Sequence, residues 1–411
     1  MLLNYLKIAW KVLQRRKFFT FVSLFGIALT LVVLLVATAL LDHVFAPHPP
    51  ESRMDRTLGV YVIGLQGDQS RRTGFPGYAF LDRYARDLPG VERTAFYTMQ
   101  EQAVSYRDGE KIVSWLKRTD GEFWEILDFR FLEGGPFTDL DETDRRFVAV
   151  INETTRDRFF GGAPALARSF EIDGQRFRVV GVVEDVPFLR ITPFADVWVP
   201  ISTQKSSGYR HEWSGSFQAI LLAGSRDRLP VVREAFAERV AQARYPDPKL
   251  FHTVRAGAET LFEAFSRELF SSDLSEAKPG VLRGFILGAA VLFMVLPAVN
   301  LVNINLSRIL ERTSEIGVRK AFGASSRALV GQFVVENVVL TLLGGLIGFA
   351  LSWVALQLLR RLQLYLVLDV NLRIFLYGML AALLFGVISG VYPAWRMARL
   401  HPVKALRGGA A

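Results

Sequence analysis

The stretch FFTFVSLFGIALTLVVLLVATALL, residues 18–41, decides the fold class, because it runs for 24 residues without a formal charge. Three further apolar stretches lie towards the other end of the chain, at residues 284–306, 328–359 and 374–395. About 20 apolar residues cross the roughly 30 Å hydrocarbon core of a bilayer, so each stretch is long enough to span a membrane. The sequence therefore predicts four transmembrane helices and excludes a soluble enzyme.

Basic residues gather beside these stretches and not on the long polar segment between the first two. The chain carries a formal charge of +9, yet residues 42–283 carry a net charge of −4. Basic clusters lie before residue 18, within residues 307–327 and within residues 396–411. Such clusters mark the cytoplasmic side of a membrane protein. We therefore expect cytoplasmic termini, an external segment at 42–283, a short external loop at 360–373 and no nucleic-acid partner.

The first 17 residues place Leu3, Leu6 and Trp10 on a helix that also carries Lys7 and Lys11. This pattern is typical of an amphipathic helix lying at the cytoplasmic face of a membrane. The apolar run that follows is too long for a signal-peptide core and ends in Asp-His instead of a small-residue cleavage site. We expect residues 18–41 to remain as a membrane anchor.

The external segment reads as mixed α/β. A strand–helix–strand order occurs twice, over residues 58–65, 80–88 and 91–99 and again over residues 217–223, 229–243 and 251–255. The repeat predicts two half-units that form one small sheet, with an insertion between them. The insertion reads as β-rich: strand 147–152, helix 153–160, and strands 169–172 and 177–183 joined at Asp173-Gly174, a hairpin turn signal. A helix over 259–274 then leads towards the second span.

A charged segment between the second and third spans carries the most specific motif. It reads Arg312-Thr-Ser-Glu315-Ile316-Gly317-Val-Arg319-Lys320-Ala-Phe-Gly323. On a helix, Arg312, Glu315 and Arg319 fall on one face. Gly317 and Gly323 allow close approach or a turn of the backbone. Charge alone favours a solvated loop that only sets topology, and a contact face for a cytoplasmic partner is the alternative.

Together with other stretches, this motif resembles the permeases of the MacB/FtsX family of ABC systems, also called type VII or mechanotransmission ABC proteins. The other matching stretches are Ala9-Trp10-Lys11 with Arg15-Arg16-Lys17, Phe159-Phe-Gly-Gly162, Phe177-Arg-Val-Val-Gly181-Val-Val-Glu-Asp185, and Tyr392-Pro393-Ala394-Trp-Arg396-Met-Ala398-Arg399-Leu-His-Pro402. They occur in the family's order and cover essentially the whole chain.

The resemblance implies an α-helical membrane protein with four transmembrane helices and a large α/β periplasmic domain of the MacB type. Porter-like β-α-β halves would occupy about 55–118 and 214–257, a β-rich sabre-like insertion about 119–213, and a stalk 259–283. Residues 307–327 would form a coupling helix, with Arg312, Glu315, Ile316, Gly317, Arg319, Lys320 and Gly323 contacting an ATPase.

The resemblance also implies partners and a place in the cell. We expect a bacterial inner-membrane protein that pairs with a cytoplasmic ABC ATPase dimer, with ATP and Mg on that partner. The chain would dimerise with itself or with a related permease and engage a periplasmic adaptor and an outer-membrane channel. Export of a peptide, macrolide or siderophore-like compound is the first reading. Lipoprotein extraction of the Lol type, and activation of a cell-wall hydrolase without transport, are the alternatives.

Catalysis finds little support in the residues. The chain has no Gly-x-x-x-x-Gly-Lys-(Ser/Thr) loop for ATP, no cysteine, and five scattered histidines without the pairing of a zinc helix. The acidic residues Asp139, Asp141, Glu142 and Asp144 lack the glycine and terminal glutamate of a calcium loop, so a solvated loop is favoured. We expect no enzyme activity, no cofactor and no metal in this chain.

Two features inside the spans invite a role in packing or transport. Small-residue pairs four apart let transmembrane helices approach closely, and three occur here: Gly284 with Gly288, Gly344 with Gly348, and Gly386 with Gly390. We predict that they lie at helix-packing or dimer contacts. Glu336 is the acid within the third span. An intramembrane carboxylate suggests a proton relay, but its place near the cytoplasmic end favours a structural or partner-contact role.

Overall fold

The computed structural model describes residues 11, 13–15, 17–107, 109–271, 277–311, 318, 322, 325–361 and 372–398. The chain divides into two compact units. One is built from the long helices before Asp42 and after Gly284, and the other is His43–Arg283, which contains every strand of the described chain.

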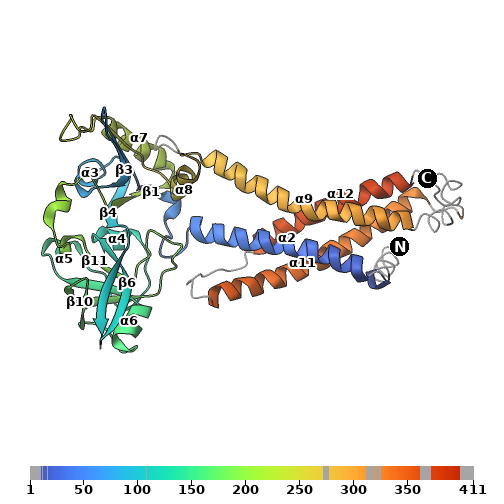
Figure 1. The fold of residues 1–411 in the computed structure, drawn as a ribbon, viewed down its shortest axis with the longest axis horizontal. Helices are drawn as coiled ribbons and strands as arrows, with labels where there is room; N and C mark the ends of the chain where they lie inside the picture. Colours follow the sequence, from blue (N-terminus) through green and yellow to red (C-terminus); the bar gives the residue numbers. More distant parts are fainter. Residues whose placement is uncertain are drawn as a thin grey trace. The chain divides into compact units, whose positions relative to one another are not determined.

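Four long helices make up the first unit (Figure 1). They are α2 (Lys17–Phe45), α9 (Pro279–Glu311), α11 (Ser326–Arg361) and α12 (Leu372–Ala398). Among the described residues, two helices are long and apolar enough to cross a membrane: α2 and the Val330–Arg360 part of α11. The apolar parts of α9 and α12, Pro279–Val295 and Phe375–Ile388, are shorter. Two candidate spans are therefore established, and a count of four stays a prediction.

The second unit is built on two sheets. The larger has the order β1-β13-β4-β6-β11-β8-β10-β7, with β5 added beside β6 and β9 beside β10. Its strands are β1 Thr57–Val60, β4 Val91–Thr98, β5 Glu101–Arg107, β6 Glu110–Thr119, β7 Phe131–Gly134, β8 Val148–Asn152, β9 Ser169–Ile172, β10 Gln175–Val183, β11 Val197–Pro200 and β13 Phe217–Ala223. β6 with β11 and β8 with β10 are parallel, and the other pairs are antiparallel. The sheet is therefore mixed.

A smaller sheet has the order β12-β3-β2-β14. Its strands are β2 Ile63–Gln66, β3 Arg71–Pro76, β12 Ser214–Gly215 and β14 Thr253–Ala256. The helices of this unit are α3 Tyr78–Tyr84, α4 Glu122–Ile126, α5 Asp139–Thr143, α6 Glu153–Phe160, α7 Leu229–Ala241 and α8 Leu261–Phe270. Short 3-10 turns are η1 Met54–Arg56, η2 Ile201–Thr203, η3 Ser207–His211 and η4 Arg226–Arg228. The predicted mixed α/β class is confirmed.

Successive side chains along the central strands point to opposite faces of the large sheet, so the hydrophobic core is divided between its two faces. In β4, Phe96 points to one cluster, and Ala95 and Tyr97 point to the other. The first cluster holds the buried residues of α3 and α7, among them Phe80 and Phe236. Because both predicted half-units contribute to it, they share one hydrophobic core. All seven residues of β13 are buried, as expected for a strand covered on both faces.

The predicted elements agree with the structure in most places and fail in two. The prediction that the two half-units form one small sheet is wrong, because β4 and β13 lie in the large sheet with strands of the insertion, whereas β14 pairs with β2 in the smaller sheet. β13 and α6 have the predicted bounds, and β9 and β10 form an antiparallel hairpin across Asp173-Gly174. The predicted single strand at residues 58–65 is wrong. It breaks at Tyr61 and Val62 into β1 and β2, which belong to different sheets. β1 is held in place by a backbone bridge between Gly59 and Glu259, a contact that local periodicity does not reveal.

Candidate functional site

The predicted ATPase-coupling residues fall on the connection between α9, which ends at Glu311, and α11, which begins at Ser326. All of them lie outside the described residues: Arg312, Glu315, Ile316, Gly317, Arg319, Lys320 and Gly323. Their contact with an ATPase stays a prediction.

The paired glycines differ in their surroundings. A Cβ built on Gly344 would lie 2.9 Å from Cβ of Ile27 in α2, and one built on Gly348 would lie 3.0 Å from the Ala28 carbonyl oxygen. Gly386 of α12 similarly faces the Thr341 hydroxyl of α11. These three positions bring helices of the first unit close together.

Gly284 and Gly288 lie on α9 and face open space. None of the described residues outside their own helix comes within 4 Å of a Cβ built at either position. Gly390 belongs to α12, but its surroundings lie outside the described residues. The prediction that all three pairs serve packing or dimer contacts is therefore left open for these positions.

Glu336 lies inside α11 with its side chain buried. The Gln332 side-chain amide, one helical turn earlier, donates a hydrogen bond of 3.2 Å to its carboxyl oxygen. The neighbouring Asn337 is buried as well. This local hydrogen bond is consistent with the structural role favoured for Glu336.

A buried charged cluster lies in the second unit, directly after α2. The Arg190 guanidinium, 1% exposed, donates to the Glu51 carboxylate at 2.9 Å. It also donates to the backbone carbonyls of Ala46 at 3.1 Å and His48 at 3.3 Å. One side chain therefore fixes the segment 46–51 onto the loop before β11. A planar guanidinium with five donors suits such a multiple contact.

Lys117, from β6, completes this cluster. Its ammonium group donates to the carbonyls of Ile191 at 2.9 Å and Thr192 at 2.5 Å, and it lies 5.3 Å from the centre of the Tyr97 ring. Burial lowers the pKa of Lys117 to about 7, and the charge of Glu51 opposes this effect. Burial likewise raises the pKa of Glu51, opposed by Arg190. The cluster therefore holds the loop around residues 190–192 from two sides.

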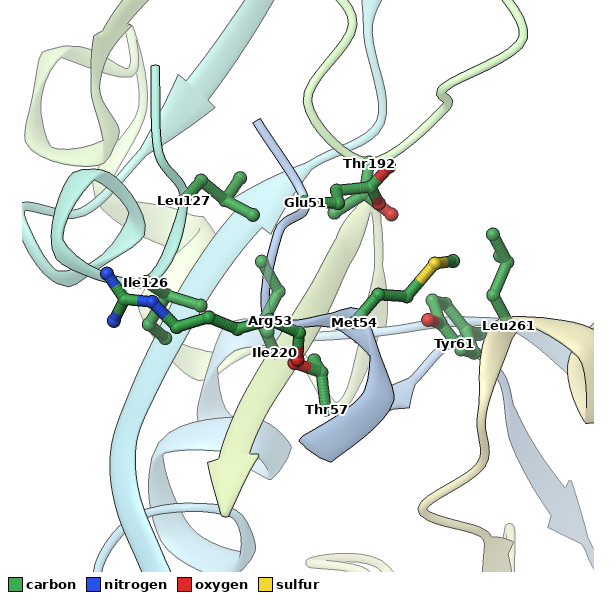
Figure 2. A pocket seen from close by; sticks show the side chains of 10 residues that line it. All are labelled: Glu51, Arg53, Met54, Thr57, Tyr61, Ile126, Leu127, Thr192, Ile220 and Leu261. Atoms are coloured by element: carbon green, nitrogen blue, oxygen red, sulfur yellow. The ribbon is translucent and has the colours of Figure 1, made fainter. Parts of the chain in front are cut away.

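The cavity beside this cluster is too small to be a substrate site. Its volume is about 30 Å³, whereas ligand pockets enclose about 300–1,000 Å³. Figure 2 shows Glu51 and Thr192 close together on one side of it, with Met54 and Tyr61 nearby. The space accommodates one or two water molecules. We therefore read the charged cluster as a structural junction.

A larger surface cavity of about 390 Å³ lies elsewhere in the domain, and its charges pair with one another. Arg118 lies 3.4 Å from Asp173 and also pairs with Glu101, and Lys205 lies 2.9 Å from Asp173. These ion pairs occupy the groups that would otherwise bind a charged ligand, so the cavity is no evident substrate site.

Helix α8 forms a second junction. The ring of Phe45 lies 5.2 Å from the ring of Phe262 and 5.6 Å from that of Phe265, measured between centres. From the other end of the domain sequence, the Arg283 guanidinium lies 5.7 Å from the Phe262 ring. A capping box of Thr260 and Glu263 begins the helix. Both ends of the segment 43–283 therefore meet on one aromatic ring.

The acidic residues at 139–144 have structural partners. Asp141 caps α5 through Thr138, and the Glu142 carboxyl accepts hydrogen bonds from the backbone and hydroxyl of Ser202. Arg146 pairs with Asp144 at 2.7 Å. No group of three or more potential metal ligands occurs among the residues that the structure describes.

These features define the class as a membrane-anchored chain with a large mixed α/β domain inserted after its first long helix. The family model of the MacB-like periplasmic core domain matches residues 20–268, and that of the FtsX-like permease C-terminal region matches residues 287–402. The chain belongs to the MacB/FtsX family of ABC transporter permeases. The resemblance drawn from the sequence motifs is confirmed.

Curated relatives agree with this family. The chain is 25% identical over 322 residues to the uncharacterized ABC transporter permease YknZ of Bacillus subtilis, covering 78% of this chain and 77% of YknZ. It is 28% identical to the macrolide export ATP-binding/permease protein MacB of Pasteurella multocida, covering 69% of this chain and 41% of that protein. It is 27% identical to the pyoverdine export protein PvdT of Pseudomonas aeruginosa, covering 98% and 58%. The chain thus spans about half the length of these two exporters.

Two solved structures are also similar. The periplasmic region of MacB from Actinobacillus actinomycetemcomitans matches at 13% identity and a TM-score of 0.38, covering 53% of this chain and 94% of that one. The extracellular domain of YknZ matches at 14% identity and a TM-score of 0.37, covering 48% and 98%.

Proposed function

We propose that this permease transmits ATP-driven motion from a separate cytoplasmic ATPase pair to its external domain, and thereby drives export of a periplasmic substrate. Membership in the MacB/FtsX family is the main support for the proposal. The position of the motif around Glu315 and Arg319 also supports it, because the motif lies in the sequence between two long helices, α9 and α11. The chain itself contains no phosphate-binding loop for ATP. In this proposal a partner ATPase hydrolyses the ATP, and the residues of this chain transmit the motion.

In this proposal four helices span the bacterial inner membrane, with both termini in the cytoplasm and residues 42–283 in the periplasm. The apolar character of α2 and α11 supports two spans directly. The apolar parts of α9 and α12, Pro279–Val295 and Phe375–Ile388, overlap the other two proposed spans. The basic clusters beside these helices support the orientation.

The two junctions supply a path for the motion. Arg190 fixes the segment 46–51 onto the domain, and Phe262 contacts both Phe45 and Arg283. A displacement of either helix end would therefore move the domain as a body.

The proposed substrate class follows the names of the relatives, and the proposed further partners follow the family resemblance. Proteins named for macrolide and pyoverdine export are similar to this chain, which favours a peptide, macrolide or siderophore-like substrate. We propose a dimer with itself or a related permease, a periplasmic adaptor and an outer-membrane channel. Lol-type lipoprotein extraction and activation of a cell-wall hydrolase are the alternatives, and copurifying proteins distinguish them.

The test is ATP hydrolysis that copurifies with the tagged chain from its native membrane in mild detergent. Wild type is compared with the double substitution Glu315→Ala, Arg319→Ala. We expect ATPase activity with the wild type and its loss with the variant, because the variant removes the charged face that contacts the ATPase. The other copurifying proteins identify the use: an adaptor for export, a lipoprotein for extraction, a hydrolase for cell-wall control.

A matched control removes the same two residue types from the external domain. Glu234 and Arg226 are both exposed, so the double substitution Glu234→Ala, Arg226→Ala should retain the copurifying activity. Absence of ATPase activity from all three preparations, with the chain folded, would refute the proposed function.

A further inference from the structure

Helix α8 exposes two large apolar side chains and buries two polar ones. Phe265 is 44% exposed and Leu269 is 55% exposed, with the charged Glu268 exposed beside them, whereas Ser266 and Arg267 are buried. A helix on the surface of a water-soluble domain has the opposite arrangement. The surroundings of α8 are therefore expected to be apolar.

The polar groups on the inner side of α8 all have partners. Arg267 pairs with Glu259 at 3.1 Å, and Glu263 pairs with Arg233 at 2.7 Å and caps the helix through Thr260. The Ser266 hydroxyl donates to the Glu263 carbonyl at 2.7 Å. These contacts fix the orientation of the helix on the domain, so that its apolar face is held outwards.

The position of Phe45 identifies what lies against that face. The uncharged run of α2 ends at Leu41, so Phe45 lies about 6 Å further along the helix at about 1.5 Å per residue. The headgroup layer extends roughly 5–8 Å beyond the hydrocarbon core on each side. Since Phe262 and Phe265 contact Phe45, they lie at the same level. Apolar side chains of an amphipathic helix reach from this layer into the edge of the hydrocarbon core.

We propose that α8 lies in the headgroup layer of the bilayer at the end of α2, with Phe265 and Leu269 inserted between lipids. The exposed Arg283 lies 5.7 Å from the ring of Phe262 on this helix and would meet the lipid phosphates. The helix would therefore give the external domain a lipid contact of its own. This inference requires only that α2 spans the bilayer, so it can fail independently of the proposed ATPase coupling.

The experiment uses the absence of cysteine from the chain. The full-length Leu269→Cys variant carries a nitroxide label and is reconstituted in vesicles of phosphatidylethanolamine and phosphatidylglycerol. Collisions with oxygen, which concentrates in lipid, are compared with collisions with a water-soluble nickel complex. We expect the label at position 269 to favour oxygen. Leu269 is largely exposed, so its replacement leaves the fold intact.

The control is Val231→Cys on α7, where the apolar side chain is similarly exposed at 42%. Its label should favour the nickel complex. If the labels at positions 269 and 231 both collided more with the nickel complex than with oxygen, the proposal would be refuted. Spin–spin broadening at position 269 that disappears on dilution with unlabelled chains would refute it too, because a second copy of the chain would then cover the face.

Discussion

Arg190 joins residues that are far apart in sequence through one buried guanidinium. Its partner Glu51 is also buried, and the ion pair is 2.9 Å long. Removing one member of a buried pair leaves the other charge without compensation, which typically destabilises a protein by about 3–5 kcal/mol. We therefore expect Arg190→Met to lower the free energy of unfolding by about that amount, measured by thermal or denaturant unfolding of the full chain in detergent.

Arg53 provides a matched comparison for this variant. It pairs with Asp128 at 3.0 Å, but the two side chains are 31% and 47% exposed, far more than those of Arg190 and Glu51. Exposed ion pairs contribute about 0–1 kcal/mol, so Arg53→Met should have a small effect. Equal destabilisation by the two variants would contradict the prediction that the buried Arg190–Glu51 pair contributes more to stability than the Arg53–Asp128 pair. Combining Arg190→Met with Glu51→Gln should recover part of the loss, because the buried carboxylate is then removed as well.

Lys117 makes the stability of the domain depend on pH. Burial lowers its pKa to about 7 from an ordinary value of 10.5. Between these values the unfolded chain holds a proton that the folded chain lacks, so stability rises as pH increases from about 7 towards 10. The slope from this one group approaches about 1.4 kcal/mol per pH unit.

The measurement compares wild type with Lys117→Met by thermal unfolding between pH 7.5 and 9.5 in detergent. The variant should lack the rise contributed by the lysine. Asp120, whose pKa burial raises to about 8, is common to both proteins, whereas Glu51 interacts with Lys117, so the difference between the two curves reports Lys117 together with its effect on Glu51. Parallel curves would show that the amine is protonated in the folded protein throughout this range.

At the scale of elements, glycines decide how closely the long helices approach. A Cβ at Gly348 would lie 3.0 Å from the Ala28 carbonyl and 3.1 Å from Cβ of Leu31, whereas Gly288 has open space around it. Gly348→Ala should therefore destabilise the helices by about 1–3 kcal/mol. Gly288→Ala should be neutral or stabilising by up to about 1 kcal/mol, because alanine is the better helix former.

Unfolding temperatures of the two variants in detergent test this difference. The same loss for both would mean that the contact between α2 and α11 does not control stability. A loss confined to Gly288→Ala would indicate that this face of α9 is covered in the assembled protein.

Elements with a local signature could be predicted from the sequence, and those that depend on distant contacts could not. The seven residues of β13 and the eight of α6 were predicted with the observed bounds, because apolar content and turn residues delimit them locally. The break at Tyr61 could not be predicted, because apolar residues continue from Leu58 to Leu65. β1 pairs with β13 in the large sheet and β2 pairs with β14 in the small one, and both partners lie more than 150 residues further along the chain.

At the scale of the whole molecule, the family and the domain class could be predicted from the sequence and the junctions could not. Motifs spread along the chain are enough to indicate the family. Arg190, by contrast, lies 139 residues from Glu51, and nothing in its local sequence distinguishes it from other arginines. Burial and distant pairing are properties of the folded chain, and a linear pattern does not carry them.

The order of strands in the large sheet has a consequence for biosynthesis. β13 lies between β1 and β4, and Thr57 pairs with Leu222. A ribosome adds about 5–20 residues per second, so β1 and β4 wait on the order of ten seconds or more for the strand that separates them. During that delay their edges are open to incorrect pairing. The nascent domain therefore depends on chaperones or on rapid provisional collapse at a stage when its membrane anchor has already been made.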